Sequence, residues 1–347
     1  MQNFKKLLLI IFTGIIALSL TACGTKDKEN NSSSVKSKDK LEIKTTVYPL
    51  KSFANQIGGK YVDVKSVYPK GMDPHTYDPS QKDMISIGKS DLFIYTGDNL
   101  DPVAKKISKS IDNKDKTLSL ESNLNTKSDL LKGEEHEHEH GEEHEHEHGE
   151  EHEHEHGEEH EHEHGEEHEH HDHGKYDPHV WLDPVLSQKF AKDIKNELVS
   201  KDKKHKDYYE KNYKKLNKEL KEIDNDMKKA VKGHEGETVY ISHDSIGYLA
   251  DRYNFKQEGI ENMSAEEPSQ KDITNIAKDI KKKNIKHVLT EENVSKKITN
   301  TVINDTNAKT IDFYNMGSHT KEQDNSKNTY QSFMKKNIES IEKALKN

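Results

Sequence analysis

The sequence contains one cysteine, one tryptophan and one arginine among 347 residues. A lone cysteine cannot form an intrachain disulfide, so the folded part must be stabilised by packing alone. Arg252 is the only arginine, and no basic stripe is interleaved with aromatic residues, which argues against nucleic-acid binding and phosphate recognition. The apolar run from Leu7 to Leu20 is too short to remain as a stable membrane-spanning helix.

The charge of the chain is divided between two unlike parts. Residues 134–173 contain 19 Glu, one Asp and no Lys or Arg, which gives this stretch a charge of −20. The rest of the chain carries 54 basic and 44 acidic residues, a charge of +10. The formal net charge of −10 therefore averages an acidic insertion and a basic remainder that is long enough for one or two domains.

The acidic insertion is a repeat of the unit Gly-Glu-Glu-His-Glu-His-Glu-His. Four copies run from Gly133 to His164 and a fifth decays towards Gly174, so that sixteen of the 23 histidines lie here. The repeat has no apolar residue and cannot offset the entropy of backbone ordering, so we predict a disordered loop over residues 133–174. Its imidazoles could bind borderline metal ions weakly at many interchangeable sites.

The N-terminus has the pattern of an export signal. Lys5 and Lys6 precede the apolar run, and small residues follow it immediately before Cys23. This resembles a bacterial lipoprotein signal, in which Cys23 becomes the lipidated first residue; the alternative is an ordinary secretory signal with an accidental cysteine. We predict a signal peptide over residues 1–22, a lipid anchor at Cys23 and a flexible polar tether over residues 23–40.

From Leu41 onwards, alternating and β-branched strand patterns take turns with helical patterns. This order predicts α/β lobes, each a mainly parallel sheet covered by helices on both faces. Between them, an apolar stripe at helical spacing runs through a charged segment of about 25 residues, which predicts one long helix of roughly 40 Å. We predict an N-terminal lobe over residues 41–203, a linking helix over 204–233 and a C-terminal lobe over 234–347.

Three histidines outside the repeat sit in loops that follow predicted strands. They are His75 and His179, each in an Asp-Pro-His sequence, and His243 in Ser-His-Asp. Ligands of open α/β sheets bind at the carboxyl ends of strands, so these histidines are candidates for a site in the cleft between the lobes. Nearby acids can accept a ring N–H and fix the tautomer, namely Asp73, Asp177, Asp183 and Asp244. Three further histidines, His205, His234 and His287, lie in Lys-rich or flexible contexts and carry no prediction.

Several segments together resemble one known family, the zinc- and manganese-binding lipoproteins that serve ABC importers. The segments are residues 68–80 (YPKGMDPHTYDPS), 177–184 (DPHVWLDP), 242–253 (SHDSIGYLADRY), 267–269 (EPS) and 290–295 (TEENVS). The resemblance covers the chain from about Leu41. It implies two lobes joined by a rigid helix, with His75, His179 and His243 as ligands of a metal at the lobe interface. The His-rich insertion is similar to that of the zinc branch. We therefore predict an accessory loop that captures zinc weakly and passes it towards the cleft; the alternative is a tolerated charged insertion that binds metal without a role in uptake.

One position departs from the family pattern. The acid that zinc-branch members supply as a fourth ligand aligns with Gly317, and either His319 or a water is left to take its place. Three neutral imidazoles favour zinc over manganese, which prefers harder oxygen ligands.

The function predicted is a solute-binding protein, not an enzyme. It would capture Zn²⁺ as a monomer at the outer face of the cytoplasmic membrane, on a Gram-positive cell surface, and deliver it to the permease and ATPase of an ABC importer. One alternative is an exported zinc hydrolase, since three histidines and an open position also form a catalytic arrangement. Outside the His/Glu repeat, however, the sequence has no His-Glu-x-x-His motif, so no helix carrying that motif is predicted. A manganese-binding member and a simple extracellular metal buffer are the others.

Overall fold

The computed structural model describes residues 40–72, 74, 77–133, 175–292, 294, 296–318, 320 and 328–346. The predicted signal peptide, the lipid anchor at Cys23, the tether up to residue 39 and the His/Glu repeat lie outside the described residues, as do His75 and His319. Within the described ranges, every helix is too short or too polar to cross a bilayer.

The first half of the described chain alternates strands with helices, as the sequence predicts. Its elements are β1 (Leu41–Thr45), α2 (Tyr48–Gly58), η2 (Gly59–Tyr61), β2 (Val62–Ser66), α3 (Gln81–Gly88), β3 (Leu92–Tyr95), α4 (Pro102–Lys109), η3 (Lys114–Lys116), β4 (Thr117–Ser119) and η4 (Leu120–Asn123).

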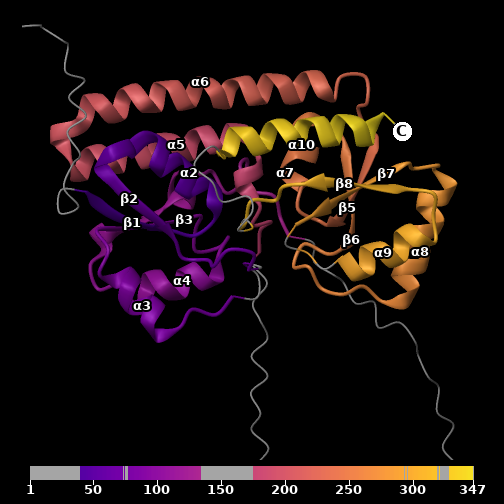
Figure 1. The fold of residues 1–347 in the computed structure, drawn as a ribbon, viewed down its shortest axis with the longest axis horizontal. Coiled ribbons are helices and arrows are strands. Elements are labelled where there is room, and N and C mark those ends of the chain that lie inside the picture. The colour runs from indigo at the N-terminus through magenta and orange to yellow at the C-terminus, as the bar shows by residue number, and fades with distance from the viewer. Residues whose placement is uncertain are drawn as a thin grey trace, which may run out of the picture. The chain divides into compact units, whose positions relative to one another are not determined.

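The remainder begins with the helices next to the repeat and continues into a second alternating series (Figure 1). Its elements are η5 (Val180–Leu182), α5 (Pro184–Lys201), η6 (Lys203–His205), α6 (Lys206–Ala230), β5 (Thr238–His243), α7 (Gly247–Tyr253), β6 (Lys256–Glu261), α8 (Gln270–Lys282), β7 (His287–Glu291), α9 (Lys296–Asn304), β8 (Lys309–Phe313) and α10 (Tyr330–Leu345).

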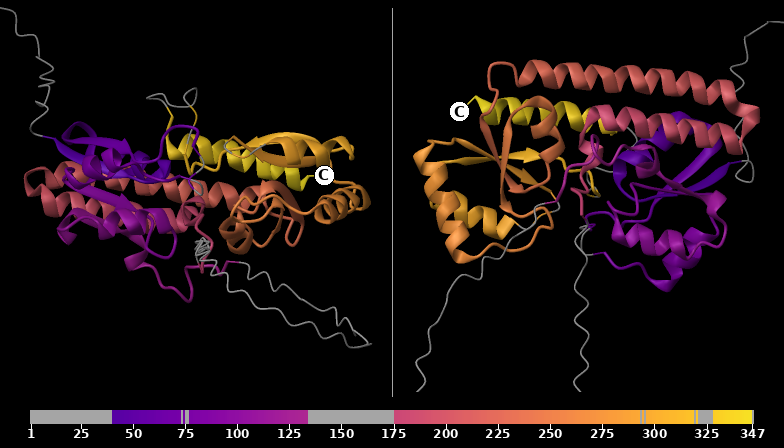
Figure 2. Two further views of the ribbon diagram at one scale, coloured as in Figure 1. Left: turned by 90° about the horizontal axis from the view of Figure 1, so that it is seen from below. Right: turned by 180° about the vertical axis from the view of Figure 1, so that it is seen from behind.

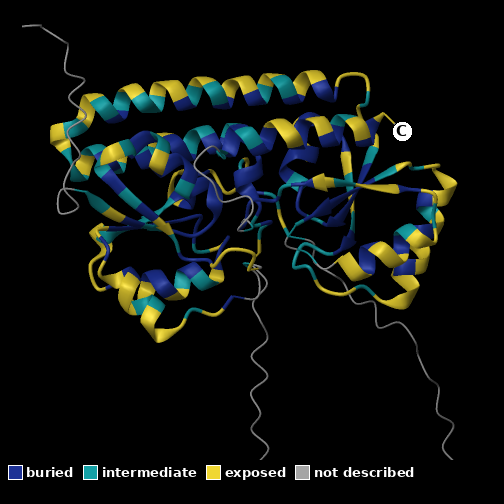
Figure 3. Ribbon diagram, viewed as in Figure 1, coloured by how far each residue is buried: buried dark blue, intermediate teal, exposed yellow. Residues whose placement is uncertain are grey.

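The strands form two four-stranded sheets of the same topology. The strand orders are β2-β1-β3-β4 and β6-β5-β7-β8, and every pairing is parallel. Parallel strands need crossover connections, which the intervening helices supply, and they are buried on both faces. All four residues of β3 are accordingly buried, and Figure 3 shows buried strands between exposed helix faces. The predicted pair of similar α/β lobes is confirmed.

The long helix α6 lies along the helices of both halves. Its predicted apolar stripe is the face that packs: Tyr209, Leu216, Leu220, Ile223, Met227 and Ala230 are buried, and Tyr213 is half-buried. At 1.5 Å per residue its 25 residues span about 37 Å. That length allows α6 to pack against α5 and α2 of the first half and α10 of the second.

The helix α10 contacts both halves as well. It packs on β7 and β8 and also on α2 and α6 (Figure 2). The Tyr330 ring meets Phe53 of α2 edge-on at 5.0 Å between ring centroids, and the backbone N–H of Tyr330 donates to Ser52 Oγ. Residues on both sides of α6 therefore belong to one compact unit, Ser37–Asn347.

Candidate metal centre

His243 is the last residue of β5, at the carboxyl end of the second sheet. The neighbours of β5 are β6 on one side and β7 on the other, so the chain leaves β5 at the point where the strand order reverses. Such a switch point leaves an opening above the carboxyl ends of the strands, where α/β proteins bind ligands. The imidazole of His243 is only 3% exposed.

Glu291 ends the adjacent strand β7 and fixes the orientation of His243. Its Oε2 lies 2.5 Å from Nδ1 of His243, and it also accepts hydrogen bonds from Ser242, Ser245 and Asn315. Burial alone would raise the pKa of Glu291, but the His243 imidazole and the two serine hydroxyls outweigh burial and lower this pKa to about 2. The carboxylate is therefore ionised, and Nδ1 of His243 must be the donor.

His179 comes from the other half of the chain, just before the short helix η5. Its backbone N–H and its Nδ1 both contact Asp177 Oδ1, at 2.9 and 2.8 Å. The edge of the Trp181 ring packs against the imidazole, and Trp181 Nε1 donates to the Asn315 carbonyl at 2.8 Å. Both histidines thus have Nδ1 held by a buried carboxylate, the arrangement that orients histidine ligands towards a metal.

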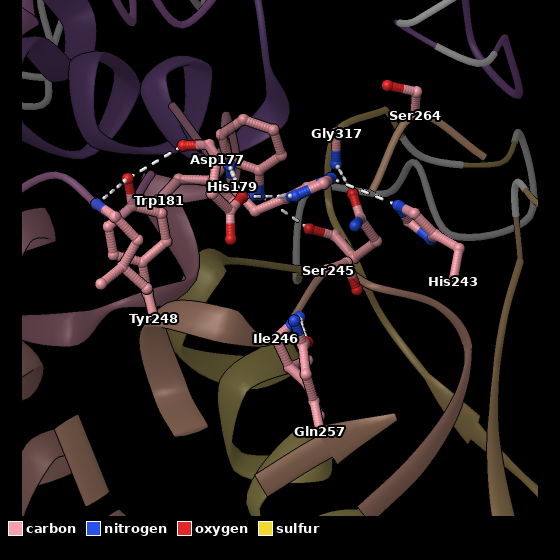
Figure 4. Close-up of polar contacts among 12 residues, drawn as sticks. Asp177, His179, Trp181, His243, Ser245, Ile246, Tyr248, Gln257, Ser264 and Gly317 are labelled. Carbon is pink, nitrogen blue, oxygen red and sulfur yellow. Dashed lines mark hydrogen bonds and ion pairs between the residues drawn. The ribbon is translucent and has the colours of Figure 1, made fainter. Parts of the chain in front are cut away.

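The Nε2 atoms of the two rings face each other. Nε2 of His179 lies 3.3 Å from Nε2 of His243 (Figure 4). When both rings are neutral and each Nδ1 donates to its carboxylate, each Nε2 presents a lone pair, and two lone pairs at this distance repel unless a proton or a cation lies between them. Two nitrogens bound to one tetrahedral zinc at 2.0–2.1 Å would be about 3.3–3.4 Å apart.

The charges around this pair favour a divalent cation. Asp177 and Glu291 are 4% and 1% exposed, and two such carboxylates, when ionised, place two negative charges beside the imidazoles. A buried charge is costly unless it is compensated, and the charge of one divalent cation equals that of the two carboxylates. Imidazole nitrogen selects zinc, copper and nickel more strongly than magnesium, calcium or manganese.

The loop that carries His75 comes from the first half of the chain and contacts the segment after β8. Ser318 Oγ donates to the Met72 carbonyl, and a Cβ built on Gly317 would lie 3.1 Å from Pro74 Cγ. The same Cβ would lie 2.9 Å from Asn315 Oδ1, which accepts the Gly317 N–H. The position aligned with the family acid is therefore packed closely around a glycine. His75 itself lies outside the described residues.

The start of this loop is fixed by a buried hydrogen bond from Tyr68. Its hydroxyl donates to Asp101 Oδ2 at 2.6 Å, while Asp101 Oδ1 caps α4 by accepting the Ala104 N–H. Burial raises the pKa of Asp101 from 3.8 to about 6, against the two hydrogen bonds, which lower it. The folded protein thus holds a proton that the unfolded chain releases between about pH 4 and 6.

We expect Asp101→Asn to flatten the pH dependence of stability. In the parent protein the protonated Asp101 contributes stability that is complete below about pH 4 and is lost as the pH rises through about 6. At roughly 1.4 kcal/mol per pKa unit, the change amounts to roughly 2–3 kcal/mol. Urea unfolding of zinc-free protein at pH 4 and pH 7 measures it, with the exposed Asp112→Asn as control. Equal pH slopes in the parent and in Asp101→Asn would contradict the assignment.

Of the three predicted acids that the structure describes, Asp177 takes the expected place beside a histidine; Asp73 lies outside the described residues. Asp183 instead caps α5 and pairs with Arg252, and Glu291, not the adjacent Asp244, holds Nδ1 of His243. Glu291 was missed because it is 48 residues from His243 in sequence. The sequence signal for Glu291 was its place at the end of a strand predicted to be buried, because acidic side chains are rarely buried unless they are paired.

Within the described parts of the chain, no group of three or more His, Cys, Asp or Glu side chains is arranged so that all of them could bind one metal ion. The described centre consists of two facing imidazoles and their two carboxylates. Of the remaining histidines, His205 stacks on Tyr61 at 3.6 Å between ring centroids and contacts Asp202, a structural role at the start of α6.

Comparison with known proteins identifies relatives along nearly the whole chain. Residues 43–344 match the family described as zinc-uptake complex component A, periplasmic. The chain is 32% identical over 343 residues to the high-affinity zinc uptake system protein ZnuA of Bacillus subtilis (strain 168), covering 99% of this chain and 98% of that protein. It is 29% identical to the zinc-binding lipoprotein AdcA of Streptococcus pneumoniae (strain R6), covering 97% of this chain and 60% of AdcA, so it spans about three-fifths of that relative.

Solved structures show the same fold. The crystal structure of the Zn(II)-bound ZnuA-like domain of S. pneumoniae AdcA is similar with a TM-score of 0.68 and 26% identity, covering 89% of this chain and 100% of that domain. The metal-dependent lipoprotein YcdH of B. subtilis is similar with a TM-score of 0.66 and 27% identity, covering 88% of this chain and 99% of YcdH.

Proposed function

The chain belongs to the family of periplasmic component A proteins of zinc-uptake complexes, and we propose that it captures Zn²⁺ and delivers it to an ABC importer. The observation that carries the proposal is the 3.3 Å separation of the His179 and His243 Nε2 atoms, each on a ring held by a buried carboxylate. This separation matches two nitrogens of one tetrahedral zinc. The relatives named as zinc-binding or zinc-uptake proteins support the same cargo.

His75 is proposed as the third ligand. Its neighbours Met72 and Pro74 contact the loop after β8, and Asn315 of that loop donates to Glu291 beside His243. The fourth position belongs either to His319 or to a water. Crystals of the zinc-loaded protein, measured at the zinc absorption edge, would identify both ligands.

The name of one relative and the N-terminal sequence pattern support a membrane context. AdcA is named a lipoprotein, and the signal pattern before Cys23 fits lipidation at that residue. We propose that the protein is tethered to the outer face of the cytoplasmic membrane by Cys23, at a Gram-positive cell surface, and that it works as a monomer with the importer's permease and ATPase. The hydrolase alternative is not retained, because the matched family is a transport component.

Deletion of residues 134–173 is expected to separate two classes of zinc binding. The repeat supplies sixteen interchangeable imidazoles, so its loss should remove several weak zinc equivalents, while the site at His179 and His243 keeps one tight equivalent. Isothermal titration of the full-length and deleted proteins counts both classes. Loss of the tight equivalent with the deletion would refute the assignment of that site to the described centre.

The deleted protein also tests the choice of metal. Competition between zinc and manganese for the single tight site should favour zinc strongly, because imidazole ligands suit zinc better. Tighter binding of manganese than of zinc would contradict zinc as the cargo and would indicate that the protein is a manganese-binding member of the family.

A further inference from the structure

The short helix α7 lies between the segments that carry the two histidines. It begins four residues after His243, in the second half of the chain, yet it lies on the segment 177–183 of the first half, which carries His179. Two sets of contacts, one at each end of α7, hold that segment.

The first set fixes Asp177, the carboxylate that orients His179. Tyr248 donates its hydroxyl proton to the Asp177 carbonyl at 2.9 Å and accepts the Leu131 N–H at 3.3 Å. A Cβ on Gly247 would lie 2.7 Å from Asp177 Oδ2, so only glycine permits this approach of the helix. Figure 4 shows Tyr248 beside Asp177 and His179.

The second set fixes the other end of the segment. Arg252 directs both Nε and Nη2 to Asp183 Oδ2, at 2.6 and 2.5 Å. The Asp183 side chain is 1% exposed, and its Oδ1 accepts the N–H groups of Val185 and Leu186 at the start of α5. A guanidinium that makes two short contacts with a buried carboxylate defines position more precisely than a single hydrogen bond does.

We propose that Arg252 is a positioning residue for the metal centre: through Asp183 it locks the His179 segment to α7 and so presets the spacing of the two imidazoles. The inference rests on the proposed zinc site. Neither residue touches the two imidazoles through a described contact, and their effect passes through the backbone of residues 177–183 and 243–247.

The physical consequence concerns how fast zinc leaves. A site whose ligands are already in place loses little conformational freedom on binding, whereas ligands on two loosely joined segments must be brought together each time. When the segments separate more often, one imidazole leaves the metal more often, so weakening this contact should raise the zinc dissociation rate.

The test compares zinc dissociation from three variants of the protein lacking residues 134–173. Arg252→Gln removes the ion pair, and Arg252→Lys keeps the charge but loses the planar two-nitrogen contact. Tyr253→Phe is the matched control, since Tyr253 is the next residue of α7 and its hydroxyl donates to Asp224 of α6, not to the segment 177–183. Dissociation into excess chelator is measured at the same interval below each protein's thermal unfolding midpoint.

We expect zinc to dissociate about tenfold faster from Arg252→Gln, at the lower end of the effects of outer-shell residues, with an intermediate rate for Arg252→Lys and a parental rate for Tyr253→Phe. The visible absorption of the Co²⁺-loaded protein should shift in Arg252→Gln alone. Parental dissociation from both Arg252 variants, or equal acceleration in Tyr253→Phe, would overturn the inference. If the unsubstituted protein itself bound no zinc tightly, the proposed function would fail instead.

Discussion

The His243→Ala variant of the protein lacking residues 134–173 is expected to bind zinc roughly a hundredfold to a thousandfold more weakly than its parent. Structural zinc sites bind with about 10–16 kcal/mol distributed over three or four ligands, so the loss of one ligand removes roughly 3–4 kcal/mol. His179→Ala should give a loss of the same size, because the two Nε2 atoms face each other across one position. Competition against a chromogenic chelator measures both affinities.

The control for this experiment is His234→Ala. His234 lies in the turn between α6 and β5, where it contacts Glu237, and it should bind zinc like the parent. If His179→Ala and His243→Ala both retained parental affinity, the tight site would lie elsewhere in the chain and the described pair would be a structural contact.

Replacing Glu291 should weaken both the fold and the metal site. Glu291→Ala leaves four hydrogen-bonding side chains without their common buried acceptor, including the His243 ring and Asn315. We expect a loss of roughly 3–5 kcal/mol in the free energy of unfolding of zinc-free protein, measured in urea. Zinc affinity should fall by roughly ten- to a hundredfold, because Nδ1 of His243 is no longer held.

Two further variants separate these effects. Glu291→Gln keeps the shape of the side chain but offers only one acceptor oxygen, so it should lose less stability and still weaken zinc binding. Glu121→Ala removes another buried carboxylate, which accepts from Asn99 in the first half of the chain, and should destabilise the protein without changing zinc affinity. Equal zinc affinity in the parent and both Glu291 variants would show that this carboxylate does not orient a ligand.

The sequence predicted the fold well because its signals are local. Alternation of apolar and polar residues marked β1 and β2, and the spacing of apolar residues along α6 identified the buried face before any contact was known. The partner of His179 was equally local, since Asp177 is two residues away. A pattern within a short window was sufficient in each of these cases.

The contacts across the chain could not be predicted in this way. Glu291 reaches His243 only because β5 and β7 are neighbours in the sheet, and Arg252 reaches Asp183 across 69 residues. In the sequence, the single arginine only argued against phosphate and nucleic-acid ligands. The structure shows that it forms a short ion pair with the buried Asp183. Such pairs depend on the arrangement of whole elements, which residue spacing does not encode.

The contact between α2 and α10 has a consequence for the order of folding. Ser52 and Tyr330, which share a hydrogen bond, are 278 residues apart, and Phe53 packs on the same tyrosine ring. Under the proposed export, a chain that emerges N-terminus first presents α2 to the outside long before α10 can cover it. Contacts of such long separation form slowly. The packing of α2 can therefore be completed only after α10 has emerged. A chain truncated before Tyr330 would expose apolar surface of α2 to extracellular proteases.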